Sequence, residues 1–377
     1  MDTKKQTKSL LLAHFHTYPR LTLADLLKFL HQSAFGCEHL LSDPSAATDY
    51  IRREAAGCSP HSGDLIEPLD GTHCRVHLDI LRQGITPETF GKLFYLSAAS
   101  VENGQLLLEE KLTALQELIT DGELPFSAEE AAGMISAWRA EGFPARRHSE
   151  TFRNEYHPAY RVIKKEYALF LPLFAKIDEL LSRNGADSTA AVSNFQEAGH
   201  TNDAHGITIA IEGGSASGKS TLGQLLEQVY GCTVLHMDDF FLRPEQRTPE
   251  RFSQPGGNVD RERFLEEVLL PQSRHQSIEY RRFDCSTFTV QPPVTIHPGR
   301  LTVIEGAYSM HPELADYYDF SAFLDIDPDL QKKRILKRNS EKFAQRFFNE
   351  WIPMEHRYFD TFHIKENCDM IIPVRES

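Results

Sequence analysis

The chain has 377 residues, of which 41% are hydrophobic and 25% are charged, as in ordinary folded globular proteins. This length allows two or three domains. The formal net charge of -14 at pH 7 argues against broad electrostatic binding to nucleic acid or to an anionic membrane, although a local basic pocket for a nucleotide is compatible with it.

The six cysteines are scattered and form no CxxC pair, which is typical of free, mostly buried thiols in a reducing cytosol. No long apolar region follows the N-terminal residues, so we expect no signal peptide. No apolar run approaches the length of a membrane span. The sequence therefore predicts a cytoplasmic protein without membrane or nucleic-acid partners, and it leaves open whether the chain forms a homo-oligomer.

Residues 1–183 are predicted to form a mostly α-helical domain, because apolar residues recur there at helical spacing. The stretch 65–78 contains turn residues and an alternating pattern, which favours a short hairpin among the helices. The helices are expected to cover 22–30, 43–56, 103–119, a stretch that opens at Ser127, and 160–181.

Several cysteine and histidine side chains of this domain could bind a metal ion by ligand type alone. Their spacing matches no recognised zinc motif, so a helical core with polar surface histidines is the favoured interpretation. We recognise no family in this domain. The residues concerned are Cys37, His39, His73, Cys74, His77 and His157.

Residues 184–205 are rich in Ser, Ala, Asn, Gly and Asp, which is typical of an exposed linker between domains. Over 206–377 the pattern changes to alternating strands and helices, which predicts an α/β fold with a parallel sheet wrapped by helices. Ligands of such sheets bind beyond the carboxyl ends of the strands. The expected strands cover 207–211, 233–236, 301–305, 321–325 and 370–373.

The segment Gly-Gly-Ser-Ala-Ser-Gly-Lys-Ser at 213–220 fits the phosphate-binding loop pattern G-x-x-x-x-G-K-[ST]. A predicted strand precedes it and a predicted helix follows it, so backbone N–H groups and the helix N-terminus can face an anion. Lys219 can reach the β- and γ-phosphates, and the Ser220 hydroxyl can ligate Mg²⁺. An ordinary tight turn is the weaker interpretation, because a turn needs neither side chain. The candidate nucleotide-binding residues are Gly213, Gly214, Ser215, Ala216, Ser217, Gly218, Lys219, Ser220 and Thr221.

Acidic residues follow two further strands at the same edge of the predicted sheet. Asp238 and Asp239 come after the strand 233–236, and Glu305 ends the strand 301–305. Phosphoryl transfer uses a carboxylate to hold Mg²⁺ and often a carboxylate to accept the proton of the attacking hydroxyl. Asp238 is the candidate base, and Ser220, Glu305 and Asp238 are the candidates on the metal side. Each acid could instead cap the next helix, but their shared edge favours a functional role.

A basic helix is expected over 328–338, where Arg334 and Arg338 share one face. Such cations can neutralise charge on a transferring phosphoryl group, so both arginines are catalytic candidates. A solvated helix face is the alternative, and it is the favoured interpretation for the neighbouring lysines.

From Ile207 to Pro373 the sequence resembles the uridine kinase and phosphoribulokinase-like branch of the P-loop kinases. The resemblance covers fewer than half of the residues. The motifs that carry it are, in order, GGSASGKST, HMDDFF, GGNVD, VIEGAY, FLDIDPDLQKKRILKRN and MIIPV.

This resemblance implies a kinase that uses ATP and Mg²⁺. It assigns the role of general base to Asp238, the first aspartate of HMDDFF. It assigns the acid of an EG motif to Glu305 and acceptor binding to Asp260 of GGNVD. It also places lid arginines in the region from Arg334 to Arg338.

Departures from the branch leave the acceptor open. Uridine kinases usually have Asp-Ser-Phe-Tyr where this chain has Asp-Asp-Phe-Phe at 238–241, a run that nicotinamide riboside kinases also carry. The histidine and tyrosine that recognise a pyrimidine have no counterpart, although Tyr280 and Arg282 stand in the corresponding region. We therefore take Asp239, Asp260, Tyr280 and Arg282 as candidate substrate-binding residues.

The leading hypothesis is an ATP-dependent phosphotransferase that acts on a hydroxyl of a small metabolite, such as a nucleoside or another riboside. A second hypothesis is an ATP-sensing regulator whose kinase-like domain controls the helical domain without turnover. A third makes the helical domain a separate enzyme of the same pathway. Steady ATP consumption that depends on one added metabolite separates the first hypothesis from the second.

Overall fold

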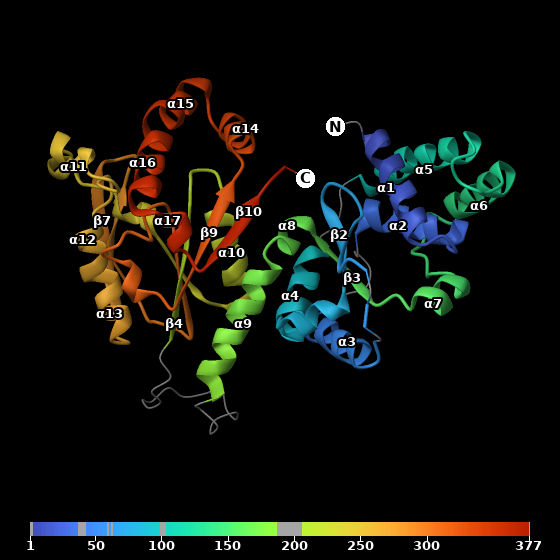
Figure 1. Cartoon of the computed structure of the whole chain (residues 1–377), viewed down its shortest axis with the longest axis horizontal. Helices are drawn as coiled ribbons and strands as arrows, with labels where there is room; N and C mark the ends of the chain where they lie inside the picture. The colour runs from blue at the N-terminus through green and yellow to red at the C-terminus, as the bar shows by residue number, and fades with distance from the viewer. Residues whose placement is uncertain are drawn as a thin grey trace. The chain divides into compact units, whose positions relative to one another are not determined.

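The computed structural model describes residues 3–36, 43–58, 60–61, 63–98, 103–186 and 206–376. It divides into two compact units, Met1–Asp178 and Glu179–Ser377, whose elements are labelled in Figure 1. The division falls within helix α9 (Leu171–Ala186). Of the predicted linker, 184–186 end this helix, and 187–205 lie outside the described residues.

The N-terminal unit is mostly helical, as predicted, and two of the predicted helices begin at polar caps that the sequence indicates. The Asp43 side chain accepts a hydrogen bond from Ala46 N, and the Ser127 hydroxyl accepts one from Glu130 N. Its helices are α1 (Thr3–Thr17), α2 (Leu23–Phe35), α3 (Pro44–Ala56), α4 (Pro87–Ser97), α5 (Gly104–Thr120), α6 (Ala128–Ala140), α7 (Glu150–Tyr156), α8 (Lys165–Ala168) and α9.

This unit also contains a three-stranded antiparallel sheet. The expected hairpin at 65–78 is confirmed as β1 (Ile66–Pro68) and β2 (His73–His77). The prediction of helix from residue 160 is wrong at its start, because Tyr160–Lys164 forms strand β3 and pairs with β2. The central strand β2 therefore gains a partner from far along the chain, and only α8 and α9 continue as helix.

The C-terminal unit is built on a parallel five-stranded sheet in the order β10-β9-β4-β8-β5. All five predicted strands are confirmed: β4 (Ile207–Gly213), β5 (Thr233–His236), β8 (Leu301–Glu305), β9 (Phe320–Ile326) and β10 (Met370–Val374). Every residue of β4 and β8 is buried, as expected for strands covered on both faces.

The helices of this unit follow the strands. They are α10 (Lys219–Tyr230), α11 (Pro249–Ser253), α12 (Arg261–Phe264), α13 (Leu270–Ser273), α14 (Pro328–Arg338), α15 (Glu341–Arg346), α16 (Ile352–Phe362) and α17 (Ile364–Asn367). A second, two-stranded sheet of β6 (Ile278–Asp284) and β7 (Thr289–Ile296) was not predicted. Together these elements place the phosphate-binding loop and the acids after β5 and β8 at the carboxyl edge of one sheet.

Candidate functional site

The phosphate-binding loop joins β4 directly to helix α10. Gly213 and Gly218 have φ values of 144° and 107°, a region that side chains rarely adopt. A Cβ on Gly213 would lie 2.7 Å from the carbonyl oxygen of Leu324, so the turn requires glycine there. Gly218 is the N-cap of α10, and the positive end of that helix therefore faces the loop.

Lys219 begins helix α10, and its side chain folds back over the loop. Its Nζ donates hydrogen bonds to the carbonyl oxygens of Gly213 and Gly214, at 2.8 and 3.0 Å. Ser220 and Thr221, the next two residues, are exposed. The Oγ of buried Ser217 has no hydrogen-bond partner among the described residues. The loop thus offers a cation, exposed hydroxyls and an orphaned polar atom, which fits a phosphate ligand and its Mg²⁺.

Side chains from two later helices hold the outer part of the loop. Glu355 of α16 accepts hydrogen bonds from Ser215 N at 2.9 Å and from Ser215 Oγ at 2.5 Å. Gln331 of α14 donates to Ser215 O at 2.8 Å. Arg334 donates to the carbonyl oxygens of Ala216 and Ser217 at 3.0 and 3.1 Å.

Of the two predicted lid arginines, Arg334 therefore lies on the loop in this structure, whereas Arg338 is exposed to solvent. Gln331 and Glu355 were missed by the sequence analysis. Gln331 lies inside the motif at 323–339 but had no role assigned to it, and Glu355 belongs to no motif and lies 140 residues from its partner Ser215. Only the three-dimensional packing reveals them.

Glu212, the last residue before the first glycine, is completely buried. Its carboxylate accepts hydrogen bonds from the backbone N–H of Gly213, Tyr308 and Met310 and from the Tyr358 hydroxyl. Burial raises the pKa of Glu212 to about 7 in spite of these donors. The residue fastens the loop to the segment after β8 and to α16. An acid inside an otherwise apolar strand was the signal that could have found it.

The acids after β5 and β8 come together at the sheet edge as predicted. Glu305 is buried, and its Oε1 lies 2.5 Å from His236 Nδ1. This hydrogen bond raises the pKa of His236. The Asp238 side chain is exposed to solvent, but partial desolvation by the surrounding protein raises the pKa of its carboxyl. Lys219 opposes that rise and Glu305 adds to it, so both charges act at Asp238.

The backbone after β5 is not extended. Residues Met237–Phe240 form a turn of 3₁₀ helix, so the alternation of an extended chain does not separate the side chains of Asp238 and Asp239. Asp239 is nevertheless engaged differently from Asp238. The Tyr280 hydroxyl donates to Asp239 Oδ2 at 3.3 Å, and Arg282 Nε lies 3.3 Å from the same oxygen.

Three of the four predicted substrate-binding residues, Asp239, Tyr280 and Arg282, are thus neighbours, and the hairpin β6–β7 supplies two of them. The fourth, Asp260, lies beside this group, because its N–H donates a hydrogen bond to the carbonyl oxygen of Phe240 at 2.7 Å. It is buried, caps helix α12 through Arg263 N, and accepts a hydrogen bond from Gln246 Nε2 at 2.9 Å. The Arg263 side chain joins the two aspartates, since its Nε lies 3.5 Å from Asp260 Oδ2 and it donates to the Asp239 carbonyl oxygen.

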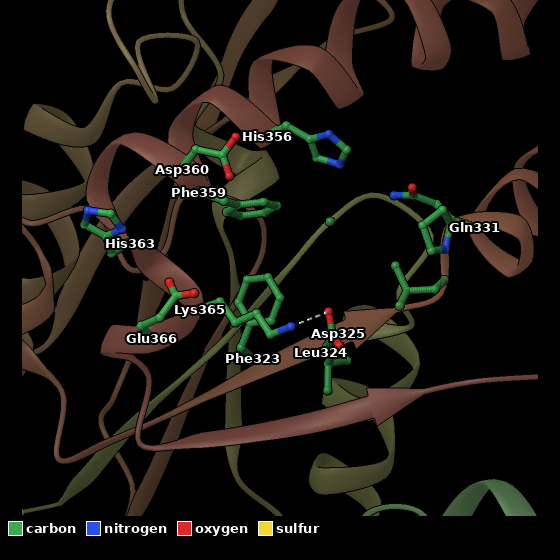
Figure 2. A pocket seen from close by; sticks show the side chains of 13 residues that line it. Phe323, Leu324, Asp325, Gln331, His356, Phe359, Asp360, His363, Lys365 and Glu366 are labelled. Carbon is green, nitrogen blue, oxygen red and sulfur yellow. Dashed lines mark ion pairs between the residues drawn. The ribbon is translucent and has the colours of Figure 1, made fainter.

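A separate pocket of about 390 Å³ lies against the start of the loop, between β9, α14, α16 and α17. Figure 2 shows Phe323 and Phe359 inside it and Lys365 paired with Asp325 at 3.1 Å. Gly214 and Gln331 also line it. The acids Asp238 and Glu305 are not among its lining residues, so this pocket is not the place where they act.

Other sequence expectations have simpler outcomes. Within the described ranges, no group of three or more His, Cys, Asp or Glu side chains is placed to hold a metal ion. Of the residues proposed for an N-terminal metal site, Cys37 and His39 lie outside those ranges. The cysteines that the structure describes are free thiols. No helix in the described part of the chain is long and apolar enough to cross a membrane.

Residues 208–346 match the family described as Phosphoribulokinase / Uridine kinase. This match lies within the C-terminal unit, whose phosphate-binding loop and parallel five-stranded sheet are consistent with it. No family model matches the N-terminal region.

The curated relatives are distant and cover only part of the chain. Uridine kinase of Bacillus cytotoxicus is 23% identical over 185 residues, which are 44% of this chain and 85% of that protein. Uridine-cytidine kinase 2-B of Danio rerio is 25% identical over 211 residues, or 50% of this chain and 80% of that protein. These similarities support a small-molecule kinase.

Solved structures give weaker similarity. A possible uridine kinase from Bacillus stearothermophilus has a TM-score of 0.36 and 20% identity, and covers 52% of this chain and 99% of its own. D-glycerate 3-kinase from Cryptococcus neoformans has a TM-score of 0.37 and 14% identity, covering 53% of this chain and 93% of its own.

Proposed function

We propose that the chain is an ATP-dependent phosphotransferase that transfers the γ-phosphoryl group of ATP to a hydroxyl of a small metabolite, such as a nucleoside or another riboside. The observation that carries this proposal is the convergence at one sheet edge of the glycine loop with Lys219 and the acids Asp238 and Glu305. Lys219 and Glu305 both act on the pKa of the Asp238 carboxyl, so the three groups share one electrostatic environment.

The residues of the loop would hold the phosphates, since its N–H groups and the N-terminus of α10 favour an anion. Ser220 and Glu305 would hold Mg²⁺, with Asp238 beside them. When bound, Mg²⁺ neutralises charge on the phosphoryl oxygens.

In the transfer, the acceptor oxygen forms a bond to the γ-phosphorus, and the bond from that phosphorus to the ADP oxygen breaks. Asp238 takes the proton of the acceptor hydroxyl. Its raised pKa suits this role, because a base works best when its pKa lies near the operating pH. Lys219 and Arg334 would compensate the charge that develops on the transferring group.

The test is ADP release by the full chain with ATP, Mg²⁺ and a panel of ribosides, sugars and vitamins. We expect one class of acceptor to stimulate steady turnover and Lys219→Ala to abolish it, while the exposed Lys337, changed to Ala, serves as the matched control. Turnover of Lys219→Ala at the parent rate would refute the loop assignment. Tight ATP binding without turnover on any acceptor would favour the ATP-sensing regulator instead.

A further inference from the structure

One arginine near the carboxyl edge of the sheet lacks the acidic partner that several nearby arginines have. Arg247 follows the Asp-Asp-Phe-Phe run, and its Nε donates to the carbonyl oxygen of Leu242 at 2.9 Å. Its guanidinium lies over two rings of the β6–β7 hairpin, 4.8 Å from the centroid of Phe288 and 5.5 Å from that of Phe283. One backbone bond and two ring faces therefore fix the orientation of this cation.

No acidic side chain of the described residues forms an ion pair with Arg247. Several nearby arginines have one, as the contacts of Arg243, Arg251, Arg261, Arg263 and Arg282 show. A guanidinium held in place with unused N–H donors is suited to bind a planar or tetrahedral anion.

Arg247 contacts the same hairpin that contacts Asp239. The hairpin that supplies its two aromatic rings also supplies Tyr280 and Arg282, which contact Asp239. Cys285, in the turn of this hairpin, is exposed. Burial raises the pKa of its thiol, and the charges of Arg247 and Asp238 make smaller contributions of opposite sign, so both charges lie within electrostatic reach of Cys285.

We propose that the phosphate acceptor carries an anionic group, a carboxylate or a phosphate, that binds the guanidinium of Arg247. The inference rests on the proposed kinase function and narrows its acceptor class. The acceptor hydroxyl would then face Asp238 while its anion lies against the hairpin. Arg247 acts as a specificity-determining residue, because it selects the acceptor by charge without taking part in the proton transfer.

The first test needs no known acceptor. The full chain is alkylated at Cys285 with iodoacetate, an anion, and separately with neutral iodoacetamide, and the two rates are followed on the Cys285 peptide by mass spectrometry. The ratio of the rates cancels the thiolate fraction and reports the attraction of an anion. We expect Arg247→Gln to lower this ratio about 3- to 10-fold. As a control, exposed Arg281 of strand β6, changed to Gln, should leave the ratio of the two rates unchanged. An equal ratio in the parent and Arg247→Gln overturns the anion site.

The second test compares acceptors in matched sets, such as glycerol, glycerate and glycerol 3-phosphate, and ribose, ribonate and ribose 5-phosphate. We expect an anionic member to stimulate ADP release more than its neutral counterpart, and the two anionic members distinguish carboxylate from phosphate. For that acceptor, Arg247→Gln should raise KM about 10- to 100-fold with the KM of ATP unchanged, and Arg281→Gln should not.

The outcomes separate the two proposals. Turnover of neutral acceptors alone, at equal KM in the parent and Arg247→Gln, overturns this inference and leaves the kinase function standing. An unchanged KM for an anionic acceptor in Arg247→Gln also overturns it. No turnover with any acceptor overturns the kinase function, and the alkylation ratio then judges the anion site by itself.

Discussion

The N-terminal unit buries charged side chains of both signs, whereas the buried charged residues described in the C-terminal unit are acids, two of which stand where its strands end. In the N-terminal unit Asp25, Arg75 and Lys111 are almost completely buried and come from different elements. In the C-terminal unit the buried acids Glu212 and Glu305 both stand at the carboxyl edge of the sheet.

This difference has consequences for prediction. A parallel sheet brings the residues after its strands to one edge by topology alone, so a sequence pattern suffices to find them. The N-terminal network joins residues that no local pattern connects. Asp25 contacts His148, 123 residues away, and His148 Nε2 lies 2.6 Å from the Tyr160 hydroxyl.

The largest expected effect is on the chemistry of the sheet edge. Asp238→Asn should lower kcat about 10²- to 10⁴-fold with little change in ATP affinity, since a positioned base contributes this much. Asp239→Asn should act mainly on acceptor KM or on stability, because Asp239 contacts Tyr280 and Arg282. Kinetics of both variants at saturating ATP test this assignment. If Asp239→Asn were inactive and Asp238→Asn nearly normal, the base would be Asp239.

The base acts in its ionised form, and the pKa of Asp238 is raised. The kcat of the parent should therefore fall as pH falls through a pKa above that of an ordinary aspartate.

The next effect concerns the interior of the N-terminal unit. Arg75 binds Glu67 at 3.1 Å and donates two hydrogen bonds to Gln32. Arg75→Ala leaves a carboxylate without its cation and should cost about 3–5 kcal/mol of unfolding free energy. The surface pair of Arg139 with Glu109 has bidentate geometry at 2.7 Å, yet Arg139→Ala should cost at most ~1 kcal/mol. Denaturant unfolding of both variants measures the two changes in unfolding free energy. Equal changes would mean that burial does not determine how much each ion pair contributes to stability.

A smaller effect is expected for Glu212. Its pKa in the folded protein is about 7 against an ordinary 4.5, so folding favours the protonated form. The stabilisation is complete below pH 4.5 and is lost as pH rises through about 7. The free energy of unfolding should fall by ~3 kcal/mol over this range, because each pKa unit corresponds to about 1.4 kcal/mol. Glu212→Gln cannot ionise and should lack this loss, whereas exposed Glu279, changed to Gln, should retain it. Urea unfolding at pH 5 and pH 8 decides, and identical pH dependence in all three proteins would contradict the assignment.

The smallest effect on activity is expected from cutting the chain between its halves. We propose that the composition of 184–205 makes it the linker between an N-terminal domain at 1–183 and a kinase domain at 206–377, and that mild proteolysis cuts there first. The kinase half should then keep its ADP release. Peptide sequencing of the early fragments checks the position of the cut, and early cuts within 207–377 would argue against this boundary.

Much of the C-terminal unit could be predicted because its signals are local. The glycine loop and the apolar strands each carry their own pattern, and the acids follow from the topology. The 3₁₀ turn at Met237–Phe240 carries no such signal. The strand β7 was missed because Pro292 and Pro293 argue against a strand. Its second edge has no partner in the two-stranded sheet, so prolines are tolerated there.

The errors in the N-terminal unit have a different origin. Tyr160–Lys164 precedes a helical pattern and was taken as part of it, yet it pairs with β2, whose Cys74 lies 89 residues from its partner Ile163. Long-range pairing overrides local preference. The same applies to Arg75, whose partners Gln32 and Glu67 stand on separate elements.

The contacts that Gln331, Arg334 and Glu355 make with the loop backbone have a thermodynamic consequence. The loop cannot change its conformation around an anion without changing the free energy of these contacts. Occupancy of the loop and the placement of α14 and α16 are therefore linked, and such linkage is reciprocal. If one arrangement of the two helices increases nucleotide affinity by some factor, then bound nucleotide favours that arrangement by the same factor.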